Sequence, residues 1–232
     1  MYRRSGIIRH ILQKITELFS NMNESEKLFA KYLRQHYLKY NLNFPVGPNE
    51  RNIDFRVESN GQVVLCDVKE ISDSIPARKD SIDAETHIRE DIRRLRRKFG
   101  RNKPEEPCML VSMNFSSNFF TGLTVVRAML GEIGICFDKK TKQIITPIHH
   151  LPQGNAGMTK KQNTSISGIF VFDRFDESNH HLFTSPFAEH PVPTNFFPAV
   201  KTIEITKQSI DETLKELSSI MFWNMQITPS QT

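Results

Sequence analysis

The sequence IDFRVESNGQVVLCDVKE occupies residues 53–70. Two runs rich in β-branched and apolar residues flank Asn60-Gly61, a dipeptide that accepts the positive φ angles of a type I′ turn. The stretch therefore predicts a β-hairpin. With Asn60 and Gly61 as the two turn residues, Ser59 lies opposite Gln62 and Asp54 lies opposite Asp67.

The two faces of this hairpin differ in character, because side chains alternate across a sheet. One face is wholly apolar and is predicted to be buried: Ile53, Phe55, Val57, Val64, Cys66 and Val68. The other, predicted to be exposed, carries Asp54, Arg56, Glu58, Val63, Leu65, Asp67 and Lys69. Opposed β-carbons lie ~4.5 to 5.5 Å apart, so two acids at such positions destabilise a sheet unless a proton or a cation lies between them.

Two carboxylates and a lysine on rigid strands suit a hard divalent cation. Mg²⁺ takes one or two carboxylates and completes its octahedral shell with water and substrate phosphate. A neighbouring lysine can orient or help to deprotonate the attacking water and offset developing negative charge. The chemistry that this combination indicates is phosphodiester hydrolysis.

Asp54, followed on the next strand by Asp67-Val68-Lys69, resembles the PD-(D/E)xK signature of the restriction-endonuclease-like nuclease superfamily. The resemblance implies an α/β fold with a central mixed sheet flanked by helices, and a metal-dependent nuclease whose substrate is DNA or RNA, with DNA favoured. It also implies that Asp54, Asp67 and the Val68 carbonyl bind Mg²⁺ or Mn²⁺, and that Lys69 assists the water. Members often add a helical glutamate, for which Glu26 is the provisional match. Residue 53 is Ile where the signature has Pro, and Glu17 and Glu24 also precede the hairpin.

The same residues also suit purely structural roles. The charged face can be solvated, with Lys69 in a weak surface salt bridge. Glu24 and Glu26 suit the first turn of a helix because of the helix dipole. The alternative function is a catalytically inactive nucleic-acid-binding or assembly protein with a nuclease-like fold, and a third possibility is an unrelated α/β protein.

A basic helix follows the hairpin. It is predicted to start near Asp80 or Ser81, with an apolar stripe of Ile88, Ile92, Leu95 and Phe99. Cations crowd its end: Arg93, Arg94, Arg96, Arg97, Lys98 and Arg101. They complement the helix dipole or neutralise backbone phosphates, and both interpretations stay open.

The remaining patterns predict one domain over residues 1–232, with N-terminal helices over 1–42, a core over 43–150 and a C-terminal extension over 151–232. One N-terminal helix is capped by Asn23 or Ser25 and runs to about Tyr40. Further helices are expected near 7–19, 124–133 and 209–224. Strands are expected over 108–115, 166–172 and 200–205, with a hairpin joining 135–137 to 144–148. Residues 153–165, with Lys160 and Lys161, are predicted to form a mobile loop.

The composition limits the kinds of partner and the cellular location that we expect for this chain. The chain has 232 residues, a net charge of +5 and a pI near 9.1, which agrees with a polyanionic partner such as nucleic acid. No apolar run reaches the ~18 residues that span a bilayer, so no membrane association is expected. Cys66, Cys108 and Cys136 show no CxxC spacing, which favours reduced thiols and a cytoplasmic location. A homodimer stays open.

Overall fold

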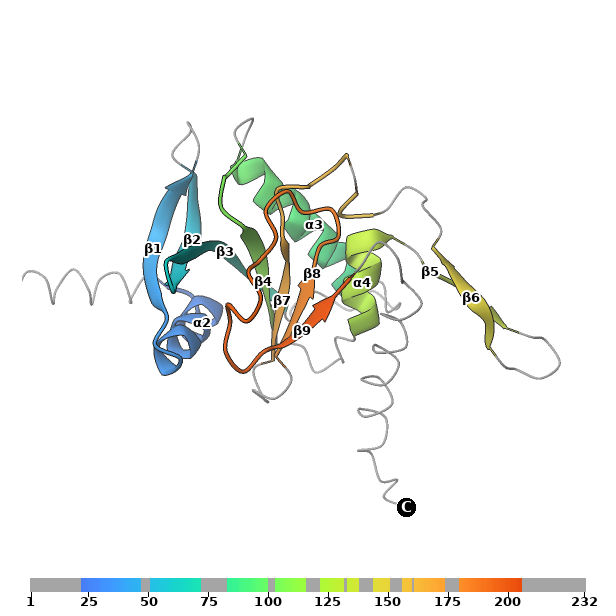
Figure 1. The fold of residues 1–232 in the computed structure, drawn as a ribbon, viewed down its shortest axis with the longest axis horizontal. Coiled ribbons are helices and arrows are strands. Elements are labelled where there is room, and N and C mark those ends of the chain that lie inside the picture. Colours follow the sequence, from blue (N-terminus) through green and yellow to red (C-terminus); the bar gives the residue numbers. More distant parts are fainter. Residues whose placement is uncertain are drawn as a thin grey trace, which may run out of the picture.

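The computed structural model describes residues 22–46, 51–71, 83–99, 103–115, 122–131, 133–137, 144–150, 156–159, 161–173 and 180–205. A seven-stranded mixed sheet runs in the order β1-β2-β3-β4-β7-β8-β9, with helices packed on it (Figure 1). Its strands are β1 Lys39–Val46, β2 Arg51–Ser59, β3 Gln62–Ile71, β4 Cys108–Asn114, β7 Gly168–Asp173, β8 His181–Thr184 and β9 Lys201–Glu204. The described helices are α2 Glu24–Gln35, α3 Asp83–Lys98 and α4 Gly122–Leu130. The predicted α/β architecture is confirmed.

The central hairpin forms as the sequence predicts. Asn60 and Gly61 have φ angles of 51° and 76°, as a type I′ turn requires. β2 and β3 pair from Ser59↔Gln62 to Phe55↔Cys66 in the predicted register. The chain then crosses through α3 and returns in β4, parallel to β3.

Each face of the sheet has its own apolar core. On one face, α2 contributes Phe29 and Leu33 to a cluster with Phe55, Cys66 and Val68. On the other face, α3 and α4 pack on Leu65, and Asp67 and Lys69 share this face by alternation. The face that was predicted to be exposed is therefore covered by α3, and Asp67 is buried.

The β1–β2 ribbon changes direction near Asn43. Ile53 was predicted to share a face with Phe55, but it packs with Val46 in the α3 cluster, whereas Phe55 packs in the α2 cluster. Asn43, which the register places opposite Asp54, has a φ of 51°. The strict alternation of side chains is broken at this point of the ribbon.

The helix predicted to run to Tyr40 ends earlier. Asn23 caps α2, which stops at Gln35, and Tyr37 is 93% exposed with a φ of 57°. Residues from Lys39 onward form the edge strand β1 instead of the end of a helix. The boundary placed at residue 42 for the N-terminal helices is therefore wrong.

Most other predicted strands are present. β4, β7 and β9 match the predicted segments, and β5 (Ile133–Phe137) pairs with β6 (Ile144–His150) in a hairpin that extends away from the main sheet (Figure 1). β8 was missed among the prolines of 173–198. The helices predicted over 7–19 and 209–224 lie outside the described residues. None of the helices that the structure describes is long and apolar enough to cross a membrane.

Candidate functional site

Two acids and two lysines from three elements meet on the face that α3 covers. Asp54 comes from β2, Asp67 and Lys69 come from β3, and Lys98 comes from the last turn of α3. The Nζ atom of Lys69 lies 2.9 Å from Asp67 Oδ2 and 3.6 Å from Asp54 Oδ2. The Nζ atom of Lys98 lies 3.5 Å from Asp54 Oδ1 and forms an ion pair with Asp67 Oδ1. The predicted trio of Asp54, Asp67 and Lys69 is thus together, and each ammonium bridges both carboxylates.

Asp54 lies just beyond the last paired residues of β2 and β3. The paired residues of β2 and β3 stop at Phe55↔Cys66, one step before the two acids would face each other. The Asp54 carboxylate instead accepts a hydrogen bond of 2.7 Å from the Val68 backbone N–H. The Asp54 side chain is 16% exposed and that of Asp67 is 0% exposed.

Burial and charge shift the protonation equilibria of the cluster. Burial, assisted by the negative charge of Asp67, raises the pKa of Asp54 to about 6, although Lys69, Lys98 and the Val68 N–H oppose this shift. Burial lowers the pKa of Lys69, but the carboxylates of Asp67 and Asp54 outweigh it, so the net pKa of Lys69 is raised. Lys69 is therefore a cation at neutral pH.

The donor atoms fit a hard divalent cation. Two carboxylates are the number that Mg²⁺ commonly takes from a protein, and oxygen donors suit Mg²⁺ or Mn²⁺ better than softer metals. Oδ2 of Asp67 is buried, and its close partner among the described residues is the Lys69 ammonium, 2.9 Å away. The Val68 carbonyl accepts a hydrogen bond of 2.9 Å from Lys69 Nζ, so it also lies beside the cluster. Among the described residues, no group of three or more His, Cys, Asp or Glu side chains is placed to hold a metal.

The structure does not bring Glu26 to this cluster. α2 packs in the apolar core of the opposite face of the sheet. The Glu26 carboxylate accepts a hydrogen bond of 2.9 Å from the Asn23 N–H, and the Asn23 side chain caps the helix in return. This reciprocal capping box satisfies the helix N-terminus, so Glu26 has a structural role there. Glu24 lies on the same helix, and Glu17 lies outside the described residues.

Two residues of α3, Lys98 and Asp91, lie near the acid pair, although the sequence did not assign them to it. The sequence groups Lys98 with the phosphate-binding cations, but its ammonium contacts the acid pair. Asp91, seven positions earlier and on the same side of the helix, is 6% exposed. Burial raises its pKa, while Arg94, 3.2 Å away, and Lys69 lower it. The sequence could have shown that Asp91 and Lys98 share one side of α3, because residues seven apart lie on one side of a helix.

The remaining predicted cations surround an open groove. Arg93, Arg94, Arg96 and Arg97 line it together with Glu90, Gln162 and Asn163. Lys98 follows Arg97 directly, so α3 joins the groove to the acid cluster. Arg101 lies outside the described residues.

No protein-family model, curated protein or solved structure matches this chain.

Proposed function

We propose that this chain is a metal-dependent nuclease that hydrolyses phosphodiester bonds, in DNA rather than RNA. The proposal rests on one observation. The carboxylates of Asp54 and Asp67 both lie within ion-pair distance of the Lys69 ammonium, beside the arginine-rich helix α3. We also propose the restriction-endonuclease-like fold that the sequence motif implies. Its support is the position of the acid hairpin inside a mixed sheet between helices.

Each residue has a role that follows from its environment. Asp54 and Asp67 would hold Mg²⁺ or Mn²⁺ through carboxylate oxygens, with the Val68 carbonyl beside them. A bound divalent cation would lower the pKa of a coordinated water and polarise the phosphate. Lys69, which is charged at neutral pH, donates hydrogen bonds and stabilises developing negative charge, and so it acts as an electrostatic group instead of a base.

The decisive experiment is cleavage of supercoiled plasmid with Mg²⁺, Mn²⁺ or EDTA, by the wild type and by Asp67→Asn and Lys69→Met. The wild type should cut only with metal. Removing the Lys69 ammonium should lower the cleavage rate about 10²- to 10³-fold. Lys31→Gln, an exposed change on α2, is the control and should cleave like the wild type.

A second function, nucleic-acid binding without catalysis, has one observation in its favour. The ammonium groups of Lys69 and Lys98 balance the negative charges of Asp54 and Asp67, so the folded protein needs no metal to neutralise these two acids. Folded wild type that binds duplex DNA but leaves plasmid intact with both metals would establish this second function and overturn the nuclease.

A further inference from the structure

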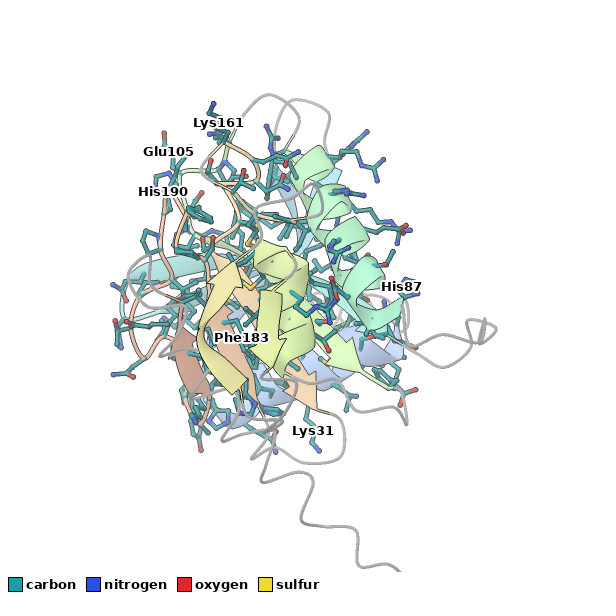
Figure 2. All side chains as sticks on the ribbon, turned by 90° about the vertical axis from the view of Figure 1, so that its right-hand side faces the viewer. Lys31, His87, Glu105, Lys161, Phe183 and His190 are labelled. Carbon is teal, nitrogen blue, oxygen red and sulfur yellow. The ribbon has the colours of Figure 1, made fainter. Side chains whose placement is uncertain are left out.

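The loop residues Lys161, Gln162 and Asn163 line the basic groove together with α3. Where α3 ends, a hollow of about 550 Å³ is lined by Arg51, Arg96, Arg97, Lys161, Gln162 and Asn163. Four of these residues are cations and two are amides, and the described lining includes no acid. Figure 2 shows Lys161 at the end of the molecule where α3 ends, with His87 near the other end of that helix.

Residues 153–155 and 160 of the loop predicted over 153–165 lie outside the described residues, and the described parts of this loop form hydrogen bonds within the loop and to α4. Thr159 and Gln162 exchange two backbone hydrogen bonds of 2.9 and 3.2 Å, and the Asn163 side chain donates to the Gly157 carbonyl. Gly157 and Met158 donate to the carbonyls of Ala128 and Met129 in α4, at 2.9 and 2.7 Å. Residues 157 and 158 thus contact α4 directly, and the bonds within the loop connect Gln162 and Asn163 to this anchored part.

Arg51 links the groove to the strand that bears Asp54. Its guanidinium donates a hydrogen bond of 2.7 Å to the Arg97 carbonyl, and the side chain remains exposed. The cations of the hollow thus come from β2, α3 and the 161–163 loop, three separate parts of the chain. Complementing the dipole of α3 explains Arg96 and Arg97, but it does not explain Lys161 on the facing loop.

We propose that this end of the groove, the hollow lined by Arg51, Arg96, Arg97, Lys161 and Gln162, binds the phosphate backbone of double-stranded nucleic acid. The inference rests on the proposed function and specifies its substrate. Lysine, arginine and amide groups are the usual donors to phosphate oxygens, and such contacts position a duplex without reading its bases. Single-stranded binding sites add aromatic side chains on which bases stack, and none lies among the described residues that line the groove.

The test measures binding of a fluorescent 20-base-pair duplex, and of its single strand, by anisotropy in EDTA, where no cleavage occurs. Arg97→Gln and Lys161→Gln should each weaken duplex binding about three- to fivefold. Each should also reduce the slope of log K against log salt concentration by about one. Lys31→Gln is the matched control, because Lys31 lies at the opposite end of the molecule from Lys161 in Figure 2, and it should bind like the wild type.

The outcomes separate the groove from the nuclease. If both groove variants bind duplex with wild-type affinity and salt slope, or if the wild type prefers the single strand, the groove proposal is overturned, whether or not plasmid is cut. If the variants bind weakly but wild type never cuts with Mg²⁺ or Mn²⁺, the groove proposal stands and the nuclease fails. Circular dichroism of each variant verifies that weak binding does not come from unfolding.

Discussion

If the proposed metal site exists, Asp54 is the residue at which protons and the divalent cation would compete. Its pKa of about 6 means that its ionised fraction rises about tenfold between pH 5 and pH 8. A cation binds the ionised form, so the increase in melting temperature caused by 5 mM Mn²⁺ should be small at pH 5 and large at pH 7.5. Differential scanning fluorimetry between pH 5 and pH 7.5 measures this increase in melting temperature.

Without metal, raising the pH lowers the contribution of Asp54 to the stability of the fold. The folded chain holds the Asp54 proton more tightly than the unfolded chain, whose ordinary pKa is 3.8. The contribution of Asp54 to stability therefore falls as pH rises from about 4 to about 6, and is constant above that. Asp54→Asn is the control and should remove both this fall and the pH dependence of the Mn²⁺ effect. An Mn²⁺ effect equal at pH 5 and pH 7.5 would contradict the assignment of Asp54 as a ligand.

Lys98 supplies positive charge where a bound cation would supply it. Lys98→Met leaves the two carboxylates with Lys69 alone, and should lower the free energy of unfolding by about 2 kcal/mol, because a buried charge pair loses one partner. Mn²⁺ should then raise the melting temperature of this variant more than that of the wild type. Urea unfolding with and without metal measures both effects.

Arg93→Gln removes an exposed charge from the same helix and should change stability by less than about 0.5 kcal/mol. If Lys98→Met is as stable as this control, the ion pairs of Lys98 contribute nothing, and its assignment to the acid cluster fails.

At the level of strands and helices, local signals predicted some elements and tertiary packing determined the others. Asn60-Gly61 predicted the hairpin, and the apolar run over 108–115 predicted the strand β4. Tyr37 stands four residues after Leu33, so the apolar spacing continued past the true end of α2. Only the pairing of Lys39–Val46 with β2 shows that this segment is a strand. For Lys98, the sequence placed it on the helix but could not show that its side of α3 meets the acid pair.

In the described parts of the loop, 156–159 and 161–163, one position has room only for glycine. A Cβ on Gly157 would lie 2.6 Å from the Ala128 carbonyl oxygen and 2.7 Å from Ile92 Cδ1, so Gly157→Ala must displace the loop or the helices. We expect a loss of about 1 to 3 kcal/mol in stability, and weaker duplex binding because Lys161 moves with the loop. Urea unfolding and anisotropy measure the two effects.

Gly61→Ala is the matched control for Gly157→Ala. Gly61 has a φ of 76° and no atom within 4 Å of an added Cβ, so its cost of about 1 kcal/mol arises from backbone conformation alone. It should leave duplex binding unchanged. Wild-type binding by a destabilised Gly157→Ala would show that the loop position does not affect the groove.

At the scale of the whole molecule, two apolar cores pack on the two faces of one sheet, and each core contains one buried cysteine whose reactivity can be measured separately. Cys66 in β3 belongs to the α2 core, and Cys108 in β4 belongs to the α3 core. Both are fully buried, and burial raises the pKa of each thiol, so neither thiolate is available in the native state. β3 and β4 are adjacent, with Leu65 paired to Cys108 and Cys66 paired to Met109.

We therefore expect both thiols to become reactive together, at the urea concentration where the far-ultraviolet circular dichroism is lost. The Cys136→Ser background leaves these two reporters, and mass spectrometry of iodoacetamide-labelled peptides quantifies each one. Opening the α2 core alone would expose Cys66 but leave Cys108 covered by α3 and α4, so labelling of Cys66 at lower urea would show that the cores unfold independently. Because neighbouring strands supply apolar side chains to both cores, separating either helical layer removes packing from strands on which the other layer depends, and a single transition follows.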